Sequence, residues 1–207
     1  SKAKYYSLIA VSMILCLYMR SITALIGLLL VLICSLNKNI LSKIISNPKV
    51  LVVSMIASAG VIFVFDYLLS IPTINYLIFN FFGKSISIFG RQVIYDEYLT
   101  KLITGERLWI GSGYNNSAIL MMSGGVFGNA QNGLMEHFVA YGLVGVFAIL
   151  STAYYCLKKG RADEHSYYML LTTYAMVIAA TVEVTINWFF FMSLFIVANC
   201  NENKIHI

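Results

Sequence analysis

Residues 131–156 are QNGLMEHFVAYGLVGVFAILSTAYYC, in which two amides, a carboxylate and an imidazole stand directly before a long apolar run. The run from Phe138 to Cys156 contains no charged residue. A helix that crosses a bilayer needs roughly 17–25 predominantly apolar residues. This stretch therefore predicts a membrane-spanning helix with hydrogen-bonding side chains at its mouth.

The rest of the chain has the same character. Of its 207 residues, 59% are hydrophobic and 11% are charged, whereas soluble domains have about 45–50% apolar and about 25% charged residues. We therefore predict an all-α integral membrane protein with membrane lipid as a partner. The net charge of +5 does not indicate a nucleic-acid partner, because the basic residues are dispersed along short loops and form no patch interleaved with aromatic residues.

Six apolar segments emerge when a window of about 19 residues is moved along the chain. They cover residues 5–19, 21–36, 50–70, 138–156, 167–182 and 186–199. We expect about six transmembrane helices, with the alternative that Glu183 and Asn187 make the last two segments one broken helix. The predicted organisation is three transmembrane helices in 1–70, an external loop in 71–137 and three transmembrane helices in 138–207.

The basic residues that flank these segments fall on one side of the membrane if the six helices alternate in direction. They are Lys2, Lys4, Lys38, Lys43, Lys49, Lys158, Lys159, Arg161 and Lys204. Because short cytoplasmic loops carry an excess of Lys and Arg, this side is assigned to the cytoplasm. We predict a multi-pass protein of the cytoplasmic membrane, whose long connection and active site face the periplasm or exterior.

The long external loop contains one amphipathic pattern. Between Arg91 and Thr104, apolar residues recur at helical spacing and polar residues occupy the opposite face. This pattern predicts a helix over 91–104 that lies on the membrane surface or on the bundle. Long loops on a compact scaffold usually carry function, so functional residues are expected here.

Two arginines stand out by their positions. Arg20 lies between the first two apolar segments, where it either snorkels to lipid headgroups or binds a phosphate. Arg91 falls in the first turn of its predicted helix, where a cation opposes the helix dipole unless an anion binds there as well. The alternative for Arg91 is an ordinary solvated surface arginine.

The polar cluster before the apolar run consists of Gln131, Asn132, Glu136 and His137. Polar groups at membrane depth are candidates for function, although Glu136 and His137 would also be satisfied as ordinary interfacial residues. Gly142 and Gly145 follow in the apolar run, and small residues of this kind let a neighbouring helix approach closely.

Several kinds of site are missing from the sequence. It has no zinc-type His/Cys cluster, no P-loop, no Gly-x-Ser-x-Gly elbow and no Rossmann fingerprint. Its four cysteines fall within or at the ends of apolar runs, without the close pairing of a metal site or disulfide framework. We expect reduced cysteines that pack in the interior, and neither a metal nor an organic cofactor.

Three segments, in this order, resemble the family of O-antigen polymerases and O-antigen ligases, which are glycosyltransferases of the bacterial inner membrane. They are RSITALIGLLLVL from Arg20, FGRQVIYDEYLTKLITGERLWIGSGY from Phe89, and AQNGLMEHFVAYGLVG from Ala130. The first is similar to the family's Ser-Arg-Thr-type helix start, the second to its Gly-Arg helix and following Gly-x-Gly, and the third to its His-Asn and Gly-x-x-Gly. Members of the family are longer, so the resemblance implies that this chain corresponds to their C-terminal portion.

The resemblance implies that the protein polymerises undecaprenyl-diphosphate-linked repeat units into surface polysaccharide, such as O-antigen, capsule or exopolysaccharide. The reaction is a metal-independent glycosyl transfer at the outer face of the cytoplasmic membrane, and a chain-length regulator is an expected partner. The resemblance assigns the diphosphate to Arg20 and Arg91, since a leaving group of this charge needs cations. The residues assigned to the acceptor hydroxyl are His137, Glu136, Gln131 and Asn132.

The sequence departs from the family at Gln131, where a histidine is frequent, because an amide is not a base near neutral pH. Whether His137 or Glu136 accepts the proton, or no side chain does, stays open at this point. The alternatives to a polymerase are a ligase that transfers glycan to the lipid A core, a polysaccharide flippase or transporter, and a purely structural membrane subunit. A transporter would place facing charges at the bilayer midplane and show inverted repeats, whereas here the polar groups cluster at one face.

Overall fold

The structure of the protein is a computed structural model. It describes residues 2–19, 21–69, 71–73, 76, 80, 100–116, 129–160 and 164–199. Its main elements are α1 (Lys2–Tyr18), α2 (Ile22–Leu36), α3 (Lys38–Ile45), α4 (Pro48–Leu69), α8 (Gly133–Lys159), α9 (Glu164–Ala179) and α10 (Trp188–Asn199). Within these residues the fold is all-helical with no strand, which confirms the predicted fold class at this level.

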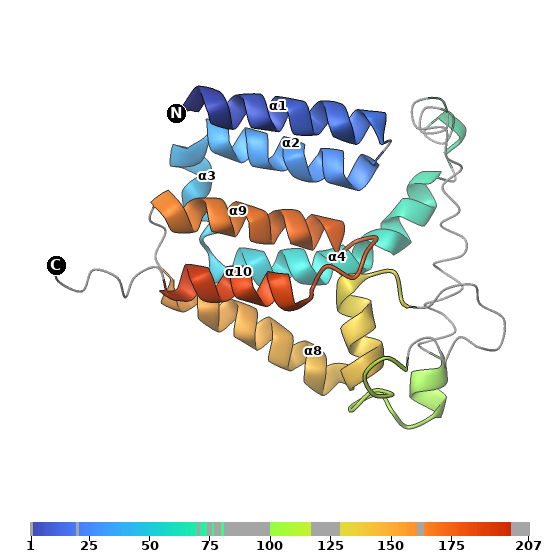
Figure 1. Ribbon diagram of the computed structural model, residues 1–207. Coiled ribbons are helices and arrows are strands. Elements are labelled where there is room, and N and C mark those ends of the chain that lie inside the picture. The colour runs from blue at the N-terminus through green and yellow to red at the C-terminus, as the bar shows by residue number, and fades with distance from the viewer. Residues whose placement is uncertain are drawn as a thin grey trace.

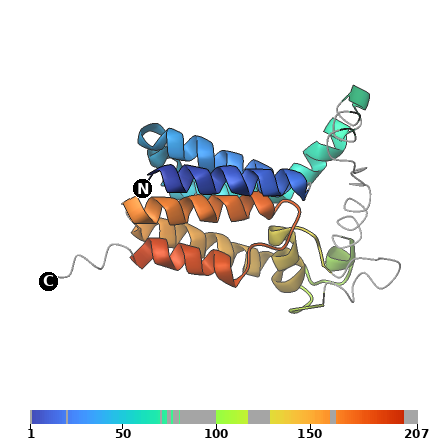
Figure 2. The ribbon, with the colours of Figure 1, turned by 45° about the horizontal axis from the view of Figure 1, so that its top comes forward.

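Six of these helices form a bundle. α1, α2, α4, α8, α9 and α10 run back and forth along one common direction, and α3 lies across one end (Figure 1). This end also holds the start of α4 and the end of α8, so the lysines of α3 gather there with Lys158 and Lys159. The start of α8 and the described part of the long loop lie at the opposite end (Figures 1 and 2).

Among the residues that the structure describes, one helix, α8, is long and apolar enough to cross a membrane by itself. A second span results if α2 and α3, which bend by 117° at their junction, are counted as one. The remaining apolar helices differ in length. α4 has 22 residues, whereas α10, with 12 residues, is about 18 Å long, against a hydrocarbon core of about 30 Å. The prediction of six spans therefore stays a prediction.

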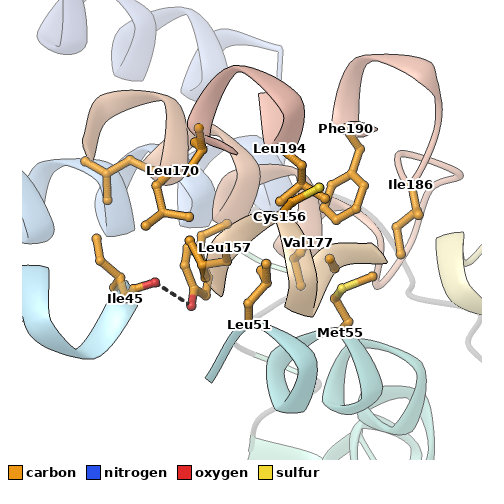
Figure 3. Close-up of a cluster of buried hydrophobic side chains, with 14 of the residues drawn as sticks. Ile45, Leu51, Met55, Cys156, Leu157, Leu170, Val177, Ile186, Phe190 and Leu194 are labelled. Atoms are coloured by element: carbon orange, nitrogen blue, oxygen red, sulfur yellow. Dashed lines mark hydrogen bonds between the residues drawn. The ribbon is translucent and has the colours of Figure 1, made fainter. Parts of the chain in front are cut away.

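The core of the bundle lies between α4, α8, α9 and α10. Leu51 and Met55 from α4 and Phe190 and Leu194 from α10 belong to one cluster of buried side chains, and all four are fully buried (Figure 3). Cys156 of α8 is buried beside them and is free. The packing agrees with the role predicted for this cysteine.

The sharp bend before α3 was not expected from the sequence. Asn37 ends α2 and starts α3, and its backbone and side-chain nitrogens both donate to the carbonyl of Ile33 at 3.0 Å. Two hydroxyls of α9 hold the bend in place: Tyr167 donates to the carbonyl of Cys34 at 2.7 Å, and Tyr174 donates to that of Ile45 at 3.0 Å. The carbonyls at both sides of the bend are thus satisfied inside the protein, as an apolar environment requires.

Two predicted helix boundaries, those of the amphipathic helix and of the fourth apolar segment, can be compared with the structure. The helix predicted over 91–104 is helical in its described part, residues 100–104, where Leu102 is fully buried, and residues 91–99 lie outside the described residues. The fourth apolar helix begins at Gly133 rather than at residue 138. Glu136 and His137, which precede the predicted apolar span, therefore belong to the first turns of α8.

Candidate functional site

The start of α8 is fixed by Asn132, the N-cap residue of the helix. Its Oδ1 accepts hydrogen bonds from the backbone nitrogens of Leu134 at 3.1 Å and Met135 at 3.0 Å. Its Nδ2 donates to the carbonyls of Ser58 in α4 at 3.0 Å and of Thr181, after α9, at 3.4 Å. One side chain thus satisfies the helix start and ties together three parts of the fold.

This geometry gives Asn132 a positioning role. The residue is 0% exposed, and both ends of its amide are bonded to backbone groups. Gly133 next to it donates its N–H to the carbonyl of Ala180 at 2.9 Å. A Cβ at Gly133 would lie 2.9 Å from the Cβ of Ala180, so the helix start is packed closely against the turn between α9 and α10.

We expect Asn132→Ala to lower the free energy of unfolding by about 2–3 kcal/mol, because it removes a helix cap, one buried amide donation and one part-buried donation. The matched control is Asn187→Ala at the start of α10, where the exposed Asn187 only accepts from the N–H of Phe189 at 3.0 Å. That control should cost about 1 kcal/mol. Thermal unfolding in detergent micelles, followed by circular dichroism, measures both, and equal losses would contradict the tying role.

Glu136 joins the first turn of α8 to the segment before the helix. Its Oε2 accepts from the N–H of Ala130 at 2.8 Å, and its half-buried carboxylate lies in the first turn of the helix, where the helix dipole favours an anion. Gln131 between them adopts a positive φ of 49° and donates its N–H to the Oδ1 of Asn129 at 2.8 Å. The polar groups of the cluster thus shape a tight turn before the helix.

His137 stands one residue further along α8 and is half-buried. Its Nε2 is bonded to the carbonyl oxygen of Ile186, just before α10. Because a carbonyl can only accept, Nε2 carries the proton and Nδ1 is the basic nitrogen of the neutral ring. The ring stacks on Tyr141 with a centroid distance of 6.0 Å and an interplanar angle of 19°. His137 is therefore held in one orientation with one defined basic atom.

The structure brings Gln131, Asn132, Glu136 and His137 together around the first turns of α8. Arg20 and Arg91, the predicted diphosphate ligands, lie outside the described residues.

A second feature near this cluster is a break within α8 at Gly142, where φ is 64° and ψ is −163°. The two parts of α8 run in clearly different directions (Figure 1). The backbone of the loop 108–113 is docked into the break by four hydrogen bonds. They are Ser112 N to Val139 O (2.8 Å), Gly113 N to Ala140 O (2.9 Å), Leu143 N to Leu108 O (2.9 Å) and Val144 N to Trp109 O (3.1 Å).

Two glycines make this docking sterically possible. A Cβ at Gly142 would lie 2.4 Å from the carbonyl carbon and oxygen of Trp109, and a Cβ at Gly111 would lie 2.5 Å from the carbonyl carbon of Ala140. Both residues also have positive φ values, 64° and 70°, which favour glycine. The predicted close approach at Gly142 is real, but the neighbour is the backbone of a loop. The expectation of a neighbouring helix is wrong there.

Gly145 has a different neighbour. A Cβ there would lie 2.1 Å from the Cβ of Tyr141, in the same helix.

The sequence features that indicate the docking of the loop at the break are the Gly-x-Gly at 111–113 and Gly142 itself. Neither feature indicates which segment packs against it, so the pairing of the loop with α8 was not predicted.

No protein-family model, no curated protein and no solved structure matches the chain.

The described residues hold no candidate metal site, but they form an open groove. In the part of the chain that the structure describes, no three His, Cys, Asp or Glu residues are grouped so that they could hold a metal ion. An open, mainly apolar groove lies between α8 and α10 at the lysine-rich end of the bundle, remote from the polar cluster. Its lining residues are Ser151, Thr152, Tyr155, Cys156, Lys159, Phe195, Ala198 and Asn199.

Proposed function

We propose that the protein is a multi-pass membrane glycosyltransferase that polymerises undecaprenyl-diphosphate-linked repeat units at the outer face of the cytoplasmic membrane. The observation that carries the proposal is the polar cluster at the start of α8, held by hydrogen bonds at one end of an apolar helical bundle while the lysines of α3 and α8 gather at the other. The resemblance of three segments to the O-antigen polymerase and ligase family supports it. Such a site meets a lipid-linked substrate at the membrane surface.

In this reaction the acceptor hydroxyl attacks the anomeric carbon of the donor sugar. The bond from that carbon to the diphosphate breaks, and the diphosphate leaves with the electron pair. We assign the diphosphate to Arg20 and Arg91, whose guanidinium groups form strong, paired hydrogen bonds to phosphate oxygens. We assign the proton of the acceptor hydroxyl to Nδ1 of His137, because its Nε2 is engaged by Ile186. Asn132 and Glu136 position the helix that carries His137.

The proposal is tested first at Arg91. We expect Arg91→Ala to reduce polysaccharide synthesis by roughly 10²–10³-fold, the usual effect of removing one donor that stabilises developing charge. The readout is the chain length of surface polysaccharide on gels, from cells that carry the variant as their only copy. Lys158→Ala, at the lysine-rich end of α8, is the control and should leave the ladder unchanged.

The same gels separate the competing functions. Loss of a polymerase leaves single capped repeat units, whereas loss of a ligase leaves no glycan attached. Full-length ladders from Arg91→Ala at a normal protein level would remove Arg91 from the mechanism.

A further inference from the structure

The second part of α8, from Leu143 to Lys159, has the dimensions of a membrane span. It is about 25 Å long, close to the thickness of a hydrocarbon core. Its exposed surface near the break is apolar, with Val144 57% and Phe147 60% exposed. It ends in Lys158 and Lys159, and lysines at a helix end reach the headgroup region. The break at Gly142 therefore lies at the opposite end of this apolar helix segment from Lys158 and Lys159.

The docked loop presents two large side chains at the level of this break. Trp109 is 61% and Ile110 is 72% exposed, and the carbonyl of Trp109 bonds to the N–H of Val144 at 3.1 Å. The turn behind them is closed by a bond from the N–H of Gly111 to the carbonyl of Arg107 at 2.7 Å. The loop is therefore tied through its backbone, and its apolar side chains point away from the protein.

The position of the other tryptophan of the chain is consistent with a membrane surface at the break in α8. Trp188 begins α10 and is exposed, and α10 starts at the same end of the bundle as the break (Figure 1). Tryptophan is enriched at membrane–water interfaces, where its ring is buried among lipid and its N–H stays hydrated. Arg107, exposed in the same turn as Trp109, carries a guanidinium suited to a lipid phosphate.

We propose that the loop 107–113 is an interfacial membrane anchor, in which Trp109 and Ile110 insert into the headgroup–acyl boundary of the outer leaflet. The inference rests on the membrane embedding that is part of the proposed function. It places Gly142 at the outer boundary of the hydrocarbon core and the first part of α8, with His137, in the headgroup layer. The diphosphate of a lipid-linked glycan lies in the same layer.

Tryptophan fluorescence tests the anchor, because the chain contains two tryptophans. Trp188→Phe leaves Trp109 as the reporter in the full chain reconstituted into liposomes. We expect emission shifted to shorter wavelength than that of tryptophan in water and protection from acrylamide. We also expect stronger quenching by lipids brominated near the headgroup than by lipids brominated near the chain ends. Water-like emission of Trp109 with full access to acrylamide would overturn the anchor.

A second reporter separates the anchor from the membrane embedding. The variant Trp109→Phe/Trp188→Phe/Phe147→Trp places the only tryptophan on the exposed face of the second part of α8, where brominated lipids should quench it. If this reporter is quenched and Trp109 is not, the anchor is wrong and the embedding stands. If neither is quenched, the embedding fails, and the proposed function fails with it.

Discussion

Gly142→Ala is expected to lower the free energy of unfolding by about 4 kcal/mol, the largest effect on stability of any change considered for this protein. Alanine strains the backbone at φ 64° and ψ −163°, a region populated almost only by glycine and costing other residues about 1–3 kcal/mol. Its Cβ also meets the backbone of Trp109 at 2.4 Å. Because that contact is with backbone, the loop must leave, and four hydrogen bonds are lost at about 0.5–1.5 kcal/mol each.

Gly60→Ala is the matched control. A Cβ at Gly60, within α4, has nothing within 4 Å, so this change should be neutral or stabilise the helix by up to about 1 kcal/mol. Gly111→Ala should reproduce the loss caused by Gly142→Ala, since its Cβ meets the same junction from the other side.

The double variant Gly111→Ala/Gly142→Ala makes the test sharper. Once the loop has left the break, the second substitution should cost little more, so the two effects should be strongly non-additive. Unfolding midpoints in detergent micelles measure all four variants. A Gly142→Ala protein with the midpoint of the parent, or two losses that simply add, would show that the loop and the break are independent.

His137→Gln is expected to reduce glycan polymerisation by roughly 10²–10⁴-fold, the usual contribution of a general base. The Nε2 of glutamine can still donate to the carbonyl of Ile186, as the histidine does, but glutamine has no basic nitrogen. The fold should therefore keep its unfolding midpoint while the activity is lost. The assay follows product length with purified protein, liposomes and a lipid-linked repeat unit.

Glu136→Gln is the control for this prediction. Its amide oxygen can still accept from the N–H of Ala130, as Oε2 does at 2.8 Å, so the turn before α8 is preserved and activity should stay within a few-fold of the parent. The opposite pattern, in which His137→Gln is active and Glu136→Gln is not, would transfer the role of base to Glu136.

The positions of the helices were predictable where a long apolar run determines them. α2 and α9 coincide with predicted segments within a few residues, because hydropathy over a window near the length of a span responds to such runs. α3 was missed, since Lys38–Ile45 is only eight residues long and contains two lysines. The predicted segment starts later than α8 because Asn132, which caps the helix, and Glu136 in its first turn are polar and lower the mean hydropathy of the window.

The break in α8 could not be predicted from local sequence. A glycine in an apolar run costs a helix only about 1 kcal/mol, so Gly142 alone does not stop it. The partner is the loop around Gly111, far away in the sequence, and only the fold brings the two together. The polar cluster was predictable as a group by spacing, but its roles were not. The burial of Asn132 and the orientation of the His137 ring depend on the backbone partners of these side chains, which lie far away in the sequence.

The junction between the loop and α8 is made by main-chain atoms on both sides, and this has an evolutionary consequence. Trp109 and Ile110 are exposed and contribute no side-chain atom to the four bonds, so selection can exchange them for other residues that suit a lipid interface without disturbing the scaffold. Sequence variation should be divided, with Gly111 and Gly142 constant beside a tip at 109–110 that varies among residues that favour the interface. Such a tip is a natural place for the protein to adapt to bilayers of different lipid composition while the fold beneath stays constant.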